Sequence, residues 1–145
     1  MDDELADLGR KISSTDQLLG WICKQTLESY GHGNFFTSFL GLSVLVEQAV
    51  REKADSVDGD YLGAVKVLLD GNTINESEAR AIATLKEMQY SVSNSYMHAP
   101  GASANFAPDG EGVVYTYNEE STWEEFMKTY LVILLRITAN LVHHN

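Results

Sequence analysis

The residues best suited to chemistry gather at the end of a predicted helix over about 73–98. Its last stretch, Met88-Gln-Tyr-Ser-Val-Ser-Asn-Ser-Tyr-Met-His98, is polar and small. His98 has the side chain that titrates closest to neutral pH, with an ordinary pKa of about 6.5, so it suits acid–base catalysis. In the alternative interpretation, His98 only caps the last carbonyls of the helix before Ala99-Pro100 and interacts with the helix dipole.

Other chemistries lack their sequence patterns. The chain has no Gly-rich phosphate loop before Lys-Ser/Thr, no Gly-x-Gly-x-x-Gly after a strand, and no Glu-x-x-His pair of the di-iron type. The single cysteine, Cys23, excludes a cysteine-based metal cluster and an intramolecular disulfide. His32, His143 and His144 lie in a turn and a tail, where zinc binding would need a carboxylate partner in fixed geometry. We expect neither a metal nor a cofactor. A Ser-His-Asp triad stays open, although nothing marks a nucleophile elbow.

Helices must position these residues, because apolar residues recur in steps of three and four along most of the chain. Capping boxes predict two helix starts. One lies over 73–78, where Thr73-Ile-Asn-Glu76 and Asn75-Glu-Ser-Glu78 are overlapping candidates, and the other is Ser121-Thr-Trp-Glu124. A further box, Ser14-Thr-Asp-Gln17, marks a point where the first helix can break or restart. In the second helix the apolar arc is wide, because Phe36 and Leu40 extend it, which is typical of a helix at the centre of a bundle. The predicted helices cover about 3–30, 34–54, 61–70, 73–98 and 121–142.

Pro100 and Pro108, the only prolines, lie in the one stretch that resembles a long loop, over about 99–120. Val113 to Tyr117 suits a short strand, but a strand without a partner is marginal. The pattern therefore predicts an all-α protein, an antiparallel up-down bundle of four or five helices that forms a single domain over 1–145.

The chain is strongly acidic, with 10 Lys and Arg against 21 Asp and Glu and a net charge of −11. Such a surface repels phosphate backbones at long range, so we expect RNA to bind weakly if at all. The acidity fits simple solubility, adaptation to salt, or a partner with a basic surface. No segment is long and apolar enough to span a membrane, and the acidic N-terminus does not resemble a signal peptide, so we expect a cytoplasmic protein without membrane contact.

The order of the motifs resembles the HEPN family (higher eukaryotes and prokaryotes nucleotide-binding domain) over roughly residues 38–140. The family's helical domains carry Arg-Asn-x-x-x-His at the end of a helix, and here Asn94 and His98 match the signature Asn and His. The resemblance also rests on Leu45-Val-Glu47, on Ile74-Asn-Glu76 and on a last amphipathic helix that contains Trp123. In the family, the His is thought to act in acid–base chemistry on the RNA 2′-hydroxyl and the Arg to stabilise the phosphorane-like charge.

The position of the signature Arg is occupied by Ser93, which carries no cation, so this charge stabilisation would be lost. A second pair, Arg136 and His143, is seven residues apart on one helical face, a spacing that the family tolerates. In the alternative interpretation, Arg136 has only a structural role: its aliphatic stem lies along apolar surface with the guanidinium in water, or the guanidinium forms an ion pair with Glu47 or Glu87.

The resemblance implies a non-catalytic HEPN-like binding protein, which would act in a toxin–antitoxin or defence system on a protein partner. One alternative is a metal-independent ribonuclease with His98 and Asn94, or Arg136 and His143, as its site. Another is an acidic helical inhibitor or decoy of a protein with a basic surface. Because the last helix and Phe35-Phe36 carry more apolar surface than one small bundle readily covers, we also expect a homodimer.

Overall fold

Helices dominate the computed structural model of the chain, which describes residues 2–55, 59–92, 105–106, 115–116 and 120–143. The all-α prediction is confirmed within these ranges. Six helices are found there rather than four or five, because the predicted first helix is divided in two and the segment over 61–70 is a helix, as predicted. Their bounds are α1 Asp3–Thr15, α2 Gln17–Gly31, α3 Phe35–Ala54, α4 Tyr61–Asp70, α5 Glu76–Val92 and α6 Glu120–His143.

Asp16 is the residue that divides the first predicted helix. Its backbone is extended (φ −139°, ψ 115°), and its Oδ1 accepts a hydrogen bond from the backbone N–H of Leu19 at 3.0 Å. An aspartate in this geometry satisfies one of the free N–H groups at the start of a helix. The break was predicted at this point, but the cap is Asp16 and not Ser14, which lies inside α1.

Of the two overlapping capping boxes predicted for the start of α5, the structure forms the one at Asn75-Glu-Ser-Glu78. The Asn75 Oδ1 accepts from the Glu78 N–H at 2.8 Å, and the Glu78 carboxylate accepts from the Asn75 N–H at 3.0 Å, so each residue caps the other. The box predicted at Ser121 is wrong, because α6 already includes Glu120 and Ser121 lies within the helix. Gly33 ends the turn after α2 with a positive φ of 78°, a conformation that glycine adopts without strain.

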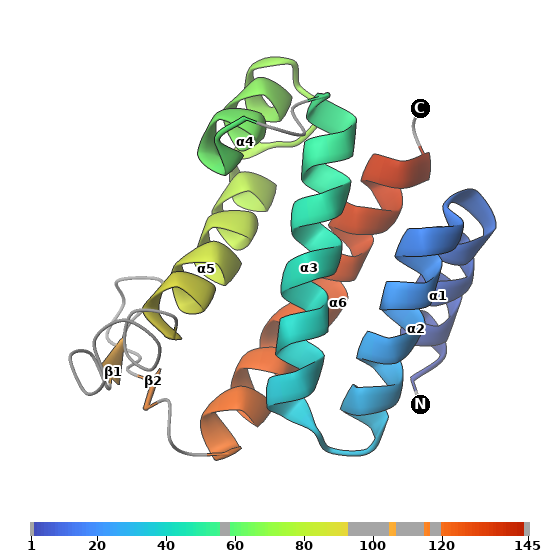
Figure 1. Cartoon of the computed structure of the whole chain (residues 1–145), viewed down its shortest axis with the longest axis vertical. Coiled ribbons are helices and arrows are strands. Elements are labelled where there is room, and N and C mark those ends of the chain that lie inside the picture. Colours follow the sequence, from blue (N-terminus) through green and yellow to red (C-terminus); the bar gives the residue numbers. More distant parts are fainter. Residues whose placement is uncertain (1, 56–58, 93–104, 107–114, 117–119, 144–145) are drawn as a thin grey trace.

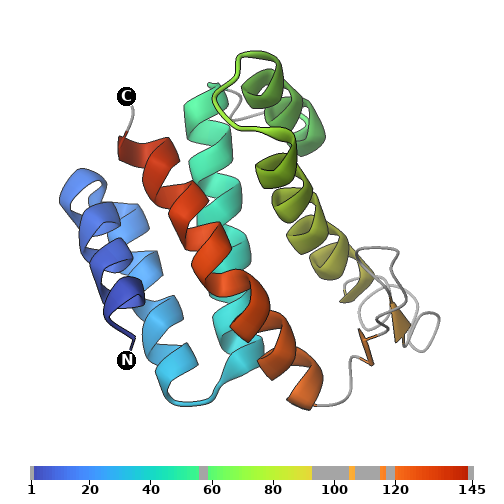
Figure 2. The ribbon, with the colours of Figure 1, turned by 180° about the vertical axis from the view of Figure 1, so that it is seen from behind.

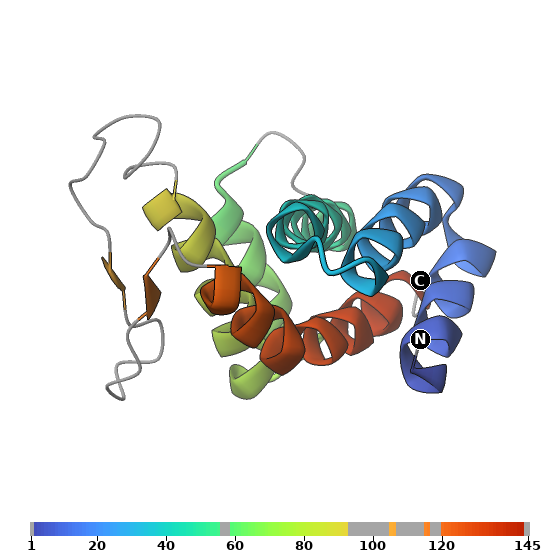
Figure 3. The ribbon, with the colours of Figure 1, turned by 90° about the horizontal axis from the view of Figure 1, so that it is seen from below.

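The long helices form two layers. α2 and α3 lie side by side in the front layer of Figure 1, and α1 and α6 lie behind them, as the views from behind and from below show (Figures 2 and 3). α3 contacts α2, α4, α5 and α6, so its predicted central position is confirmed. The core between the layers includes Ile12, Leu19, Phe39, Leu42 and Phe126, all fully buried.

The apolar surface of α6 is largely covered by the chain's own helices. α1, α3 and α5 pack on α6, and Leu131, Leu134, Leu135 and Ile137 are buried there. Among the large apolar side chains described in α6, Ile133 is the one that stays exposed, at 38%. Of the surface that motivated the homodimer prediction, the α6 part is therefore mostly buried, whereas Phe36 remains 41% exposed. The homodimer itself stays a prediction.

Most of the predicted loop over 99–120 lies outside the described residues. Within it the structure places two short antiparallel strands, β1 Asn105–Phe106 and β2 Tyr115–Thr116, with Asn105 opposite Thr116 and Phe106 opposite Tyr115. The strand predicted at 113–117 is thus present as two residues of β2, and β1 supplies the partner that the sequence pattern did not reveal.

Candidate functional site

The residues predicted from the HEPN resemblance, Ser93, Asn94 and His98, lie outside the described part of the chain. The structure describes α5 as far as Val92, directly before Ser93. The role of these three residues stays a prediction.

The alternative pair, Arg136 and His143, lies on α6. The Arg136 Nε is 2.7 Å from the Glu4 Oε1, so the guanidinium ties α6 to the first turn of α1. The predicted ion pair with Glu47 or Glu87 is wrong; the partner comes from the far N-terminal end of the chain. His143 is the last residue of α6 and is exposed, about 10 Å further along the helix axis at 1.5 Å per residue. The structure therefore gives Arg136 a structural partner and does not bring it next to His143.

A second charged cluster joins α3, α4 and α5. The Glu47 carboxylate lies 3.1 Å from the Lys86 Nζ and 3.3 Å from the Arg51 Nε. Both cations also lie over the ring of buried Tyr61, at 5.1 Å for Lys86 Nζ and 5.6 Å for Arg51 Cζ from the ring centroid. Burial, and then the charge of Glu47, raise the pKa of the Tyr61 hydroxyl far above its usual range. Glu47 on α3 pairs with both cations, and both cations cover the Tyr61 ring of α4, so the cluster holds three helices together.

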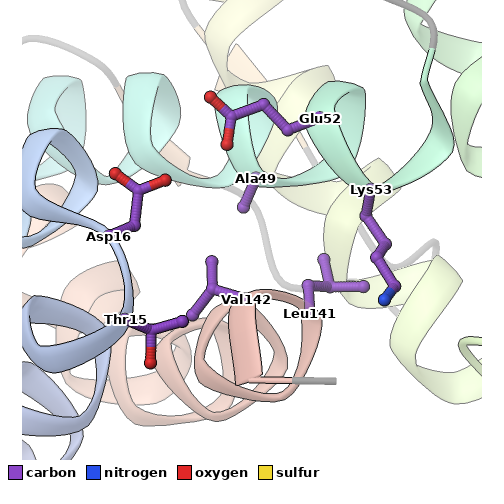
Figure 4. Close-up of a pocket in the computed structure, with 7 residues that line it drawn as sticks. All are labelled: Thr15, Asp16, Ala49, Glu52, Lys53, Leu141 and Val142. Atoms are coloured by element: carbon purple, nitrogen blue, oxygen red, sulfur yellow. The ribbon is translucent and has the colours of Figure 1, made fainter. Parts of the chain in front are cut away.

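A small pocket of about 280 Å³ opens where the α1–α2 turn meets the ends of α3 and α6 (Figure 4). The carboxylates of Asp16 and Glu52 approach it from neighbouring elements, and Lys53 lies on its other side (Figure 4). Asp16 already caps α2. In the described ranges no group of three or more His, Cys, Asp or Glu side chains is arranged to hold a metal ion. The lining of this pocket includes two carboxylates, those of Asp16 and Glu52, which is fewer than such a group has. It is a mixed polar recess rather than a site with a recognisable chemistry.

The most distinctive surface lies on the outer side of the front layer, between α2 and α3. We call it the α2–α3 face and define it by Leu18, Trp21, Leu40 and Val44, whose side chains are 45–61% exposed. A shallow groove of about 440 Å³ runs between the two helices. None of its lining residues carries a charge, in a chain where 31 of the 145 residues are Asp, Glu, Lys or Arg. The lining consists of Trp21, Ile22, Gln25, Thr26, Ser29, Thr37, Leu40, Gly41 and Val44.

Close packing of α2 on α3 forms the floor of this groove. A Cβ atom at position 41 would lie 2.4 Å from the Thr26 Oγ1, so the helices can meet here only because Gly41 has no side chain. The buried Ser38 Oγ donates a hydrogen bond to the Thr26 carbonyl oxygen at 2.9 Å. The exposed apolar side chains therefore stand on a rigid, closely packed helix pair.

The α2–α3 face was not predicted from the apolar pattern of the sequence. Leu40 and Phe36 were assigned to the apolar arc of a central helix, but both remain exposed on α3. One sequence signal pointed to this face. Leu19 and Ile22 belong to the apolar stripe of the first predicted helix, whereas Leu18 and Trp21 lie off that stripe. A large apolar side chain off the stripe is a candidate for contact with another molecule.

Comparisons with known proteins give no relative for this chain: no family model matches it, and neither a curated protein nor a solved structure is significantly similar. No helix in the described ranges is long and apolar enough to cross a membrane.

Proposed function

We propose that this chain is a non-catalytic, HEPN-like helical protein that binds another protein through the α2–α3 face. The observation that carries the proposal is the exposed, uncharged groove of about 440 Å³ between α2 and α3, with Trp21 on one wall and Leu40 and Val44 on the other. Contiguous apolar surface on an otherwise charged protein marks an interaction site, because leaving it in water costs free energy that a partner recovers.

This observation favours a binding role over the two alternatives. A purely electrostatic decoy would need only the acidic surface and would gain nothing from an exposed Trp21. A ribonuclease with Arg136 as its cation would require that guanidinium at the site, whereas it is paired with Glu4. The HEPN lineage, and with it a place in a toxin–antitoxin or defence system, rests on the sequence resemblance.

Site-specific photocrosslinking in the source cells tests the binding role. The photoreactive residue p-benzoylphenylalanine replaces Leu40 or Val44 in one pair of variants, and Leu62 or Val67 in a matched pair. Leu62 and Val67 are the same residue types on α4, with exposed fractions of 60% and 54%. We expect a discrete crosslinked protein from positions 40 and 44 that is absent from positions 62 and 67. The absence of an adduct at 40 and 44, or equal adducts at all four positions, would refute the proposal.

A further inference from the structure

We infer that the groove between α1 and α2 binds a small amphipathic carboxylate, an apolar body with one acid group, such as a medium-chain fatty acid or an aromatic acid. This groove has a volume of about 610 Å³, against about 440 Å³ for the α2–α3 groove. The two grooves share no lining residue, so the inference goes beyond the proposed function and does not depend on it. Its support is an apolar floor between two walls that each carry an exposed cation.

The floor of the groove is apolar, and on the α1 side it is made of small residues. Ala6 and Gly9 line it from α1, and buried Leu27 lines it from α2. A Cβ atom at position 9 would lie 3.1 Å from the Leu27 Cδ1, so the helices approach closely because Gly9 has no side chain. Sites for small molecules typically have volumes of about 300–1,000 Å³, mostly apolar linings and a few polar groups that fix the orientation. This floor therefore suits the apolar body of a ligand.

The packing of α1 on α2 brings the two cations, Arg10 and Lys24, to the same level of the groove. α1 and α2 form a hairpin at one edge of the bundle (Figures 1 and 2). Near its turn Ser13 packs on Gly20, where a Cβ atom would lie 2.5 Å from the Ser13 Cα, and Gly9 forms the next contact along α1. Arg10 lies between these two contacts on α1, and Lys24 lies between their partners on α2. The two cations therefore face the groove from opposite walls.

Both cations pair with acids of their own helix and not across the groove. Arg10 pairs with Asp7, and the Lys24 Nζ is 4.0 Å from the Glu28 Oε1. The four side chains are 51–71% exposed, and ion pairs this exposed stabilise a protein only weakly. Each cation can therefore turn towards a carboxylate that lies between the walls. An anion there would also relieve the repulsion between the two like charges.

The charged residues of the lining select a ligand with one negative charge. They are two cations, Arg10 and Lys24, and one acid, Glu28, whereas Asp7 does not line the groove. A net positive lining stands out in a chain of net charge −11. Glu28 opposes a second negative charge, which disfavours a phosphate dianion. The fork of N–H groups on Arg10 matches the two oxygens of a carboxylate.

Four probes with the same eight-carbon chain test the inference: octanoate, octanol, octylammonium and octyl phosphate. Each is titrated into the full chain at ~0.15 M salt, where charges are screened beyond about 8 Å, and amide chemical shifts are followed by NMR. We expect octanoate to bind with a Kd below ~1 mM and at least ~5-fold more tightly than each of the other three. The shifts should centre on Gly9 and Lys24 and leave Gly41 and Val44 of the α2–α3 groove unmoved.

Two double variants with the same change in net charge separate the local cations from the charge of the whole chain. Arg10→Gln/Lys24→Gln should weaken octanoate at least ~5-fold, to the level of octanol, and leave octanol unchanged. The matched variant is Lys11→Gln/Lys128→Gln. Lys11 is on α1 but does not line the groove, and Lys128 is an exposed lysine paired with Glu124 at 3.0 Å. This variant should leave the affinity for octanoate unchanged.

Several results would overturn the inference. Equal affinity for octanoate and octanol, no binding of either, or equal losses in the two double variants would show that Arg10 and Lys24 select no ligand. Tighter binding of octyl phosphate would contradict the assignment of a carboxylate. Shifts centred on Gly41 and Val44 would place octanoate in the α2–α3 groove instead. The crosslinking experiment decides the proposed function separately, because its positions lie outside the α1–α2 groove.

Discussion

Gly41 on α3 packs directly against Thr26 on α2, and a Cβ atom at position 41 would lie 2.4 Å from the Thr26 Oγ1 and 3.4 Å from its Cβ. The Thr26 hydroxyl cannot turn away freely, because it is buried and donates to the Ile22 carbonyl oxygen at 2.9 Å. This one contact sets the distance between the helices that form the candidate binding face.

Gly41→Ala should therefore destabilise the fold, although alanine is the better helix former. Overpacking typically costs about 1–3 kcal/mol, which exceeds the helix-propensity gain of about 1 kcal/mol. In a Thr26→Ala background the same substitution should become stabilising, because the obstructing oxygen is gone.

Gly63→Ala on α4 is the control, since its Cβ would meet only Asp60 side-chain atoms at 3.8 Å, and it should stabilise by about 0.5–1 kcal/mol. Urea unfolding of the four variants measures these signs; a stabilising Gly41→Ala in the wild-type background would refute the account.

Phe39 and Leu40 are neighbours in the sequence with opposite roles. Phe39 is fully buried, with its ring 4.9 Å from that of Trp123 and 5.7 Å from that of Phe126, whereas Leu40 is exposed on the α2–α3 face. Phe39→Ala should reduce the free energy of unfolding by about 3–5 kcal/mol. Leu40→Ser should change it by no more than about 0.5–1 kcal/mol. Similar losses for the two variants in chemical denaturation would mean that Leu40 belongs to the core.

The contrast between these residues shows how far the sequence was informative. Periodicity located five helical regions, and local chemistry narrowed the start of α5 to two overlapping caps, of which Asn75–Glu78 is formed. Both signals depend on residues close together in the chain. The pairing of Arg136 with Glu4 depends on how α1 docks on α6, and no local pattern reports that. Exposure of Leu40 was missed for a related reason: a wide apolar arc shows that a helix has several apolar neighbours, but not whether each neighbour belongs to the same chain.

Alkaline pH should destabilise the protein through Cys23. Burial raises the pKa of its thiol from 9.0 to about 11. Between these values the unfolded chain loses the proton and the folded chain keeps it, so the stability is fully present below pH 9 and falls as the pH rises towards 11. The loss attributable to Cys23 at pH 10.5 should be on the order of 2 kcal/mol.

Urea unfolding at pH 8 and pH 10.5 measures this loss, and Cys23→Ala is the comparison variant. The variant should be less stable at pH 8, because a buried side chain is truncated, but its stability should decline less between the two pH values. Some decline should remain in the variant, since Tyr61 is also buried with a raised pKa and acts in the same direction. An identical decline in both proteins would show that Cys23 does not ionise on unfolding in this range.

The last prediction concerns RNA. We expect no appreciable metal-independent cleavage, because Ser93 occupies the position of the signature Arg and the chain carries a net charge of −11. Loss of a well-placed group that stabilises the transition state typically costs about 10²–10³ in rate, and poor capture of the polyanion would reduce turnover further. Arg136→Ala should leave this inactivity unchanged and cost at most about 1 kcal/mol of stability, since its ion pair with Glu4 is exposed.

Incubation of single-stranded RNA with the protein in EDTA, followed by gel analysis, provides the measurement. If cleavage appears and is abolished by His98→Ala but not by His143→Ala, the ribonuclease alternative with His98 is correct and the non-catalytic proposal fails. Abolition by both Arg136→Ala and His143→Ala, with His98→Ala unaffected, would move the site to α6, although Arg136 would then have to leave Glu4. Ser93→Arg is the most informative variant in an inactive parent. A gain of cleavage that His98→Ala removes would require a site already shaped for RNA, because a single added cation helps only where the acid–base group is in place.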